Sequence, residues 1–142
     1  MDALAFARKL SQSYMEKAPE RKKLRVLLSD RVLQIFKAKG IDAQAFQTLT
    51  LLSRNTFYLL KKPDYKPSFE TVIALCAGLD LDITITTELL NKAGYAFDGS
   101  EKHGAYETAI TQFAGQPIHT RNEFLRNLDI AGVTTLGERG SE

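Results

Sequence analysis

Residues 52–71 read LSRNTFYLLKKPDYKPSFET, and this stretch decides the fold that the sequence predicts. Ser53 can cap a short helix extending to about residue 62, because its hydroxyl can accept a hydrogen bond from a free N–H of the first turn. Phe57 and Leu60 lie three positions apart and therefore share one face of that helix. Pro67 ends the following loop, and Ser68 can cap the next helix. The stretch predicts two helices joined by a proline-bounded loop.

The other faces of the short helix and the loop carry side chains of the kinds that contact DNA. Arginine suits the edge of guanine, asparagine suits the edge of adenine, and lysine suits phosphates. These groups, with one phenol among them, are Arg54, Asn55, Tyr58, Lys61, Lys62 and Lys66. An ordinary solvated helix face is the alternative interpretation of the same residues.

The stretch resembles the lambda-repressor-like (XRE/Cro-type) helix-turn-helix family. The family pattern of serine, two variable residues and threonine is matched by Ser53 and Thr56, and its Pro-Ser-Leu-Glu-Thr segment by PSFET at 67–71. The likeness continues through VIALCAGLDLD at 72–82 and TTELLNKAGYAF at 86–97, then through HGAYETAI at 103–110 and NEFLRNLDIAGV at 122–133. It covers roughly residues 30–136.

The resemblance implies an all-α, lambda-repressor-like helix-turn-helix bundle with an N-terminal helix and extra C-terminal helices. It also implies a sequence-specific, DNA-binding transcriptional regulator whose helix at 53–62 enters the major groove of double-stranded DNA. A glutamine at the position of Gln44 resembles a phosphate clamp. The DNA-contacting set expected on this basis is Gln44, Ser53, Arg54, Asn55, Tyr58, Lys61, Lys62 and Lys66. We expect no enzymatic activity, no catalytic or metal-binding residue and no cofactor.

Five positions, at four sites, depart from the family pattern. Leu51 stands where the turn usually has a glycine, and Leu59 where many members have a basic residue. Phe46-Gln47 replaces Leu-Ala, and Pro63 replaces the loop glycine. These departures favour the alternative function, an antitoxin-like or adaptor module that keeps the fold and binds a protein without reading DNA.

Charge divides the 142 residues into two halves. Residues 1–66 hold 14 basic and 6 acidic residues, a net charge of +8, whereas residues 67–142 hold 5 basic and 11 acidic residues, a net charge of −6. This division favours a polyanion-facing half and a second half that forms a homodimer or receives a protein partner, although two unequally charged solvated surfaces would look the same. The N-terminus lacks a signal-peptide pattern and no apolar run is long enough to span a bilayer, so we expect a cytoplasmic protein of a bacterium or phage that makes no membrane contact.

Apolar periodicity and capping residues predict the remaining elements. The expected helices are 3–17, 24–39, 43–50, 53–62, 69–79, 84–93, 100–114 and 121–131, the last opened by a capping box of Thr120 and Glu123. Residues 18–23 are expected to be a linker and 134–142 a disordered tail. The expected domains are an N-terminal helix and basic linker (1–23), a DNA-binding domain (24–97) and a C-terminal helical extension with its tail (98–142).

Several smaller groups have ordinary interpretations. The pairs His103/Glu107 and His119/Glu123 have four-residue spacing but no further ligands, so we interpret them as helix decoration. Cys76 lies on an apolar face and is expected in the core, with Phe46, Phe57, Leu60, Val72 and Leu75. The basic cluster Arg21, Lys22, Lys23 and Arg25 is either a phosphate-tracking arm or a soluble linker. A dimer is expected through the C-terminal half, including Phe113 and Phe124.

Overall fold

The computed structural model describes residues 2–137, and the side chains of this range except those of 20–26. The described chain is all-α: it contains eight helices and no strand. They are α1 (Ala3–Glu16), α2 (Ala18–Lys39), α3 (Ala43–Thr50), α4 (Arg54–Leu60), α5 (Phe69–Gly78), α6 (Ile83–Lys92), α7 (Glu101–Thr111) and α8 (Ile118–Asn127). The sequence-based prediction of an all-helical chain is confirmed.

Short polar side chains fix where most of these helices begin. The carboxylates of Asp42 and Asp82 accept hydrogen bonds from the backbone N–H three residues ahead, at 2.8 and 2.9 Å. The hydroxyls of Ser53, Ser68 and Ser100 do the same for α4, α5 and α7, at 3.2, 3.1 and 3.1 Å. Each cap satisfies a donor that the helix itself cannot pair. Residues 83–87, although β-branched, open α6, because Asp82 caps them into a helix.

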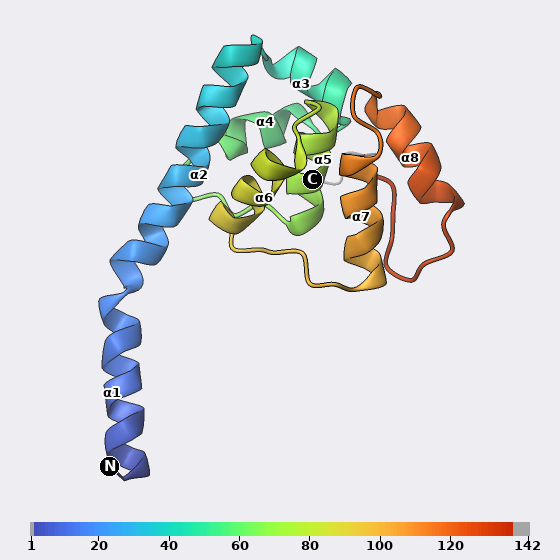
Figure 1. Ribbon diagram of the computed structural model, residues 1–142. Helices are drawn as coiled ribbons and strands as arrows, with labels where there is room; N and C mark the ends of the chain where they lie inside the picture. The colour runs from blue at the N-terminus through green and yellow to red at the C-terminus, as the bar shows by residue number, and fades with distance from the viewer. Residues whose placement is uncertain (1, 138–142) are drawn as a thin grey trace.

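Helices α2 to α8 form one body around a shared core, with α5 in its middle (Figure 1). Every residue of α5 from Val72 to Ala77 is buried, so this helix contacts neighbours on all sides. The rings of Phe36, Phe46 and Phe57 cluster with centroids 4.9–5.7 Å apart and join α2 to the α3–α4 pair. The predicted core set of Phe46, Phe57, Leu60, Val72, Leu75 and Cys76 is buried as expected.

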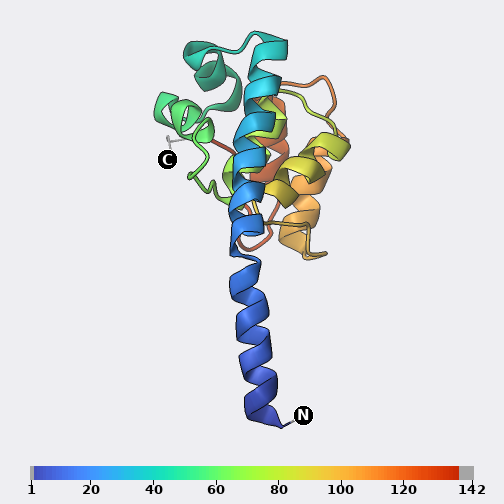
Figure 2. The same ribbon diagram turned by 90° about the vertical axis from the view of Figure 1, so that its left-hand side faces the viewer.

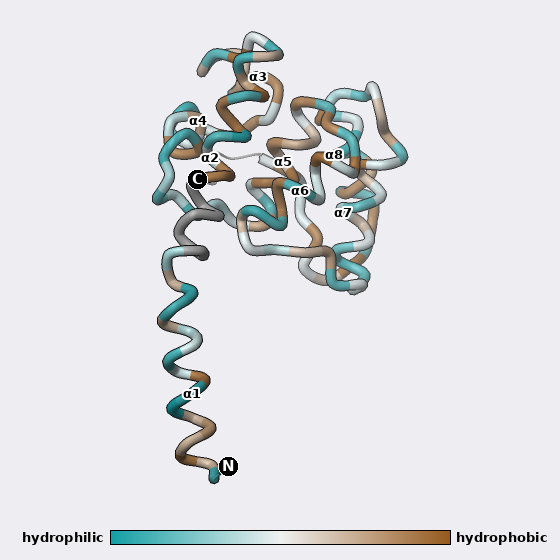
Figure 3. The backbone as a smooth tube through the Cα atoms, turned by 60° about the vertical axis from the view of Figure 1, so that its left-hand side comes forward, coloured by the Kyte–Doolittle hydropathy of each residue, from teal (hydrophilic) through white to brown (hydrophobic). Residues whose placement is uncertain are grey.

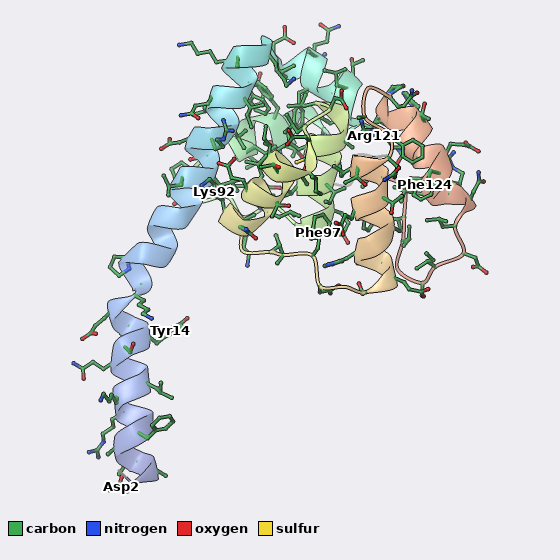
Figure 4. All side chains as sticks on the ribbon, viewed as in Figure 1. Asp2, Tyr14, Lys92, Phe97, Arg121 and Phe124 are labelled. Atoms are coloured by element: carbon green, nitrogen blue, oxygen red, sulfur yellow. The ribbon has the colours of Figure 1, made fainter. Side chains whose placement is uncertain are left out.

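A buried arginine connects the turn between α5 and α6 to the connection between α7 and α8. Arg121, on α8, is 0% exposed and labelled in Figure 4. Its guanidinium donates to the carbonyls of Gln116, Ala109 and Phe113 at 3.1, 3.3 and 2.8 Å, and to the Asp80 carboxylate at 2.7 Å. Asp80 lies in the turn between α5 and α6. The side chain therefore ties that turn to the connection between α7 and α8.

Three predicted boundaries are wrong. The helix α2 begins at Ala18, so residues 18–23 form its first turns and are not a linker. Pro19 is compatible with this position because the N–H groups of the first helical turn make no hydrogen bond within the helix. Pro117 precedes α8, which starts at Ile118 and ends at Asn127, and Thr120 forms no side-chain cap. The predicted tail is ordered over 134–137: Leu136 is buried, and its N–H and C=O bond to the Asn122 amide at 2.6 and 3.0 Å. The prediction for 138–142 lies outside the described residues.

The first helix stands apart from this body. Figures 1 and 2, which are turned by 90° from each other, both show α1 projecting beyond the N-terminal end of α2. No residue of α1 is buried. Figure 3 shows hydrophobic residues recurring along α1 all the same. No helix within the described residues is both long enough and apolar enough to cross a bilayer.

Candidate nucleic-acid interface

The helices α3 and α4 form a pair joined by the short connection Leu51–Ser53. Thr50, which is fully buried, holds this turn: its hydroxyl donates to the Phe46 carbonyl at 2.7 Å and accepts from the Leu52 N–H at 3.1 Å. The Leu51 N–H donates to the Gln47 carbonyl at 3.0 Å. These bonds satisfy the polar groups at the end of α3 and set the angle at which α4 leaves.

Leu51 adopts the left-handed conformation that the sequence pattern assigns to glycine. Its φ is 63° and ψ is 9°. The turn therefore keeps the conformation that a glycine would favour, although a side chain with a Cβ stands there.

Two glycines elsewhere allow the chain to pack closely on this turn. A Cβ on Gly78, at the end of α5, would lie 2.6 Å from the Leu49 carbonyl oxygen and 2.7 Å from the Thr50 Cα. A Cβ on Gly137 would collide with the backbone of Thr50 and lie 3.1 Å from the Leu51 Cβ. The α3–α4 turn is thus clamped between the end of α5 and the C-terminal segment.

The short helix α4 separates its apolar and polar residues as the sequence predicts. Thr56, Phe57 and Leu60 are buried against the body. Arg54 and Asn55 are exposed, and Tyr58 is 52% exposed. Leu59 is half-buried. A helix anchored in this way presents a guanidinium, an amide and a phenol to the outside at fixed positions.

Neighbouring side chains contact the charged groups of Arg54 and Lys61. The Arg54 Nε donates to the Gln47 Oε1 on α3 at 2.9 Å, which leaves the remaining guanidinium N–H groups available to a ligand. The Lys61 ammonium lies 4.2 Å from the Phe57 ring centroid and 5.0 Å from that of Tyr58. The sequence marks Gln47 only as a departure from the family pattern; its role as a partner of Arg54 was not predicted, because a seven-residue separation across a turn gives no periodic signal.

The remaining residues predicted to contact DNA lie around α4 and not on its exposed face. Gln44 is exposed in the first turn of α3, and Lys62 is exposed directly after α4. The exposed Lys66 lies beyond the loop, with its ammonium 5.7 Å from the Tyr95 ring. The Ser53 hydroxyl is already engaged, because it accepts from the Thr56 N–H at 3.2 Å and bonds the Thr56 hydroxyl at 3.0 Å.

The basic cluster Arg21, Lys22, Lys23 and Arg25 lies outside the side chains that the structure describes. Its backbone belongs to α2. For this cluster the structure therefore describes only a helical backbone.

Two of the titratable residues noted in the sequence, His103 and Cys76, have structural partners. The His103 ring stacks on Phe69 with centroids 4.1 Å apart, and its Nδ1 accepts from the Asp98 N–H at 3.0 Å. Burial raises the pKa of the Cys76 thiol to about 12, and a hydrogen bond with Thr86 offsets this only partly. Among the described residues, no three side chains of His, Cys, Asp or Glu lie close enough together to hold a metal ion.

The exposed face of α4, with Gln44 and Gln47 from α3, forms a polar surface beside a turn that buried contacts hold in place. It combines hydrogen-bond donors of fixed orientation with nearby lysines. No family model matches this chain, and no curated protein and no solved structure matches it either.

Proposed function

We propose that this protein is a sequence-specific DNA-binding transcriptional regulator of the XRE type, with a lambda-repressor-like helix-turn-helix made of α3 and α4. In this proposal α4 enters the major groove, and the protein acts by occupying its site rather than by catalysis. The single observation that carries the proposal is the anchoring of α4: three buried residues hold the helix while Arg54, Asn55 and Tyr58 are exposed together.

The chemistry of these groups supports reading of bases. An arginine can donate two bonds to guanine O6 and N7, and an asparagine can form the matching pair with adenine. The bond from Arg54 to Gln47 restrains the guanidinium before any DNA arrives. A side chain that is ordered before binding lowers the entropic cost of binding.

The lysines around α4 support contacts with phosphates. Lys62 and Lys66 are exposed, and Gln44 stands at the start of α3 where its amide can reach the backbone of a duplex. Phosphate contacts set the position of a protein on DNA and do not depend on sequence. The proposed interface therefore has both kinds of contact that a sequence-specific reader needs.

The proposal is tested first by the salt dependence of binding. The full chain is titrated with random duplex DNA between about 50 and 200 mM salt, where release of counterions should steeply weaken binding. Selection from a random-sequence pool then supplies a preferred site. Absence of binding to random duplexes at low salt, with no sequence enriched, would exclude the DNA-binding function.

Two kinds of variant should then behave differently on the selected site. Lys62→Ala should weaken binding to every sequence alike and reduce the salt slope by about 1. Arg54→Ala and Asn55→Ala should each cost about 1–3 kcal/mol on the selected site and relax the preference at one base pair. Arg126→Ala removes one positive charge from the exposed surface of α8 and should leave both measurements unchanged.

A second candidate function, the antitoxin-like or adaptor module, is favoured by a different observation. A groove of about 410 Å³ lies between α2 and α4, lined in part by Leu33, Phe36, Ile41 and Phe57. Leu33 is 42% exposed there, and Leu49 on α3 is 41% exposed. Apolar side chains of this kind suit a protein partner better than a phosphate backbone. Failure of every DNA experiment above would leave this function in its place.

A further inference from the structure

The helices α3 and α4 are linked across their turn by a bond between two exposed side chains. The Arg54 Nε donates to the Gln47 Oε1 at 2.9 Å. Gln47 directly follows Phe46, which is fully buried, and Arg54 is the first residue of α4. The backbone between them is held by the bonds of Thr50 and by the left-handed Leu51. The glutamine and the arginine therefore extend from fixed positions on the body.

This bond decides which edge of the guanidinium remains for a ligand. A guanidinium is a planar fork of N–H donors, and it can present either Nε with one Nη, or both Nη groups, to a pair of acceptors. In Arg54 the Nε N–H is directed at Gln47. The edge formed by the two Nη groups is the one that stays suited to a pair of acceptors, and guanine offers such a pair at O6 and N7.

We infer that Gln47 is a positioning residue that makes Arg54 selective for guanine. This role rests on the proposed DNA-binding function and adds a residue to it. An arginine that rotates freely can turn from a wrong base to a phosphate oxygen, so the mismatch costs little. An arginine held at Nε loses that bond when it turns, and when it stays it leaves its Nη donors unpaired against a wrong base. Specificity is a difference between affinities, and Gln47 enlarges this difference by making the wrong complexes less stable.

The residue type at position 47 supports this role. The helix-turn-helix pattern that the sequence resembles has Leu-Ala where this chain has Phe46-Gln47. The methyl group of an alanine cannot accept a hydrogen bond, so it could not hold an arginine. Gln47 is exposed, so packing of the core does not require a long side chain there. The departure from the pattern therefore supplies an acceptor within reach of Arg54.

The base preference at the pair that Arg54 contacts tests this role. Arg54→Ala first identifies that base pair within the site selected from the random pool. Gln47→Met keeps the length of the side chain and removes the acceptor. It should lower the preference for guanine at this pair by about 3- to 10-fold, the range expected when one long side chain must be ordered on binding. Gln47→Glu keeps an acceptor for the Arg54 Nε, so it should retain the preference while its negative charge weakens binding to all sequences alike.

Two controls separate positioning from other effects. Gln44→Met makes the same substitution at another exposed position of α3, and it should leave the preference for guanine unchanged. In the Arg54→Ala background, Gln47→Met should have no further effect on the preference, because Gln47 acts through Arg54. Near-UV circular dichroism and the urea midpoint check that each variant is folded.

A measurement without DNA tests the bond itself. In the NMR spectrum of the free, isotope-labelled full chain, the Arg54 Nε–H should exchange with water several-fold more slowly in the wild type and in Gln47→Glu than in Gln47→Met. Equal exchange rates in the three proteins would overturn the positioning role.

The positioning role and the DNA-binding function fail in different ways. If Arg54→Ala relaxes a guanine preference and Gln47→Met leaves that preference unchanged, the role of Gln47 is overturned while DNA binding stands. An effect of Gln47→Met that persists without Arg54 also overturns it, since Gln47 would then contact DNA by itself. A site at which Arg54→Ala relaxes no preference for guanine has the same consequence. A wild-type chain that binds no duplex overturns both.

Discussion

Leu51 allows a sharp test of the turn between α3 and α4. The residue has φ of 63°, a conformation that costs an L-residue with a Cβ about 1–2 kcal/mol and costs glycine nothing. We compare Leu51→Gly with Leu51→Ala. Both variants remove nearly the same packing of the half-buried leucine, so the difference between them isolates the backbone conformation.

The expected magnitude follows from two opposing terms. The left-handed conformation disfavours alanine by about 1–2 kcal/mol, and the larger entropy of the unfolded chain disfavours glycine by about 0.5–1 kcal/mol. Leu51→Gly should therefore have a free energy of unfolding about 0.5–1 kcal/mol higher than Leu51→Ala. This order is the reverse of the order found inside helices.

Urea denaturation followed by circular dichroism measures this difference. With an unchanged slope of roughly 1–3 kcal/mol per molar urea, the midpoint of Leu51→Gly should lie a few tenths molar above that of Leu51→Ala. Leu49, which is 41% exposed within α3, provides the matched control. There Leu49→Gly should be less stable than Leu49→Ala by about 1 kcal/mol. Glycine below alanine at both positions would refute the left-handed assignment and the strain derived from it.

Two further predictions concern the buried polar groups. Arg121→Ala leaves three carbonyls without their donor and creates a cavity, so it should lower the free energy of unfolding by about 3–4 kcal/mol in thermal or urea denaturation. Arg126 is exposed on the same helix, and Arg126→Ala should lower the free energy of unfolding by about 0.5 kcal/mol or less. Equal effects of the two substitutions would contradict the structural role of Arg121. Because burial raises the pKa of Cys76 to about 12, the native thiol should stay protonated and resist a thiol reagent at pH 8–9, and should react rapidly only after unfolding in denaturant. Rapid labelling of the folded chain would show that α5 is not packed as described.

Local rules predicted most of the fold from the sequence. Serine and aspartate caps with 3.6-residue apolar spacing located α3 to α7 and the core, because both signals depend on residues within one or two turns. Residues 83–87 alternate β-branched side chains and locally suggest a strand, but the short segment runs directly into residues 88–92 with Gly94 as a stop, and this favoured a helix from about residue 84. The exposed set Arg54, Asn55 and Tyr58 followed from the same periodicity, since the buried face of α4 leaves these positions outside.

The errors occurred where distant contacts decide the structure. The ordering of Leu136 depends on Asn122 and on the turn at Thr50, and a single leucine in a polar segment gives no periodic signal. The burial of Arg121 was not predicted, because its four partners lie 5 to 41 residues away along the chain. Gln47 was missed as a partner of Arg54 for the same reason. The linker expected at 18–23 was a different error, since proline is compatible with a helix start.

The packing of Gly137 on the α3–α4 turn has a consequence for the order of events during synthesis. The turn at residues 50–52 leaves the ribosome more than 80 residues before the segment that covers it. At about 5–20 residues per second the helices α2 to α6 have several seconds in which to collapse before Leu136 and Gly137 exist. During that interval the backbone of Thr50 and Leu51 faces water or a chaperone. Native closure of the turn is therefore a late, long-range step, and contacts of such high sequence separation are those that slow folding most.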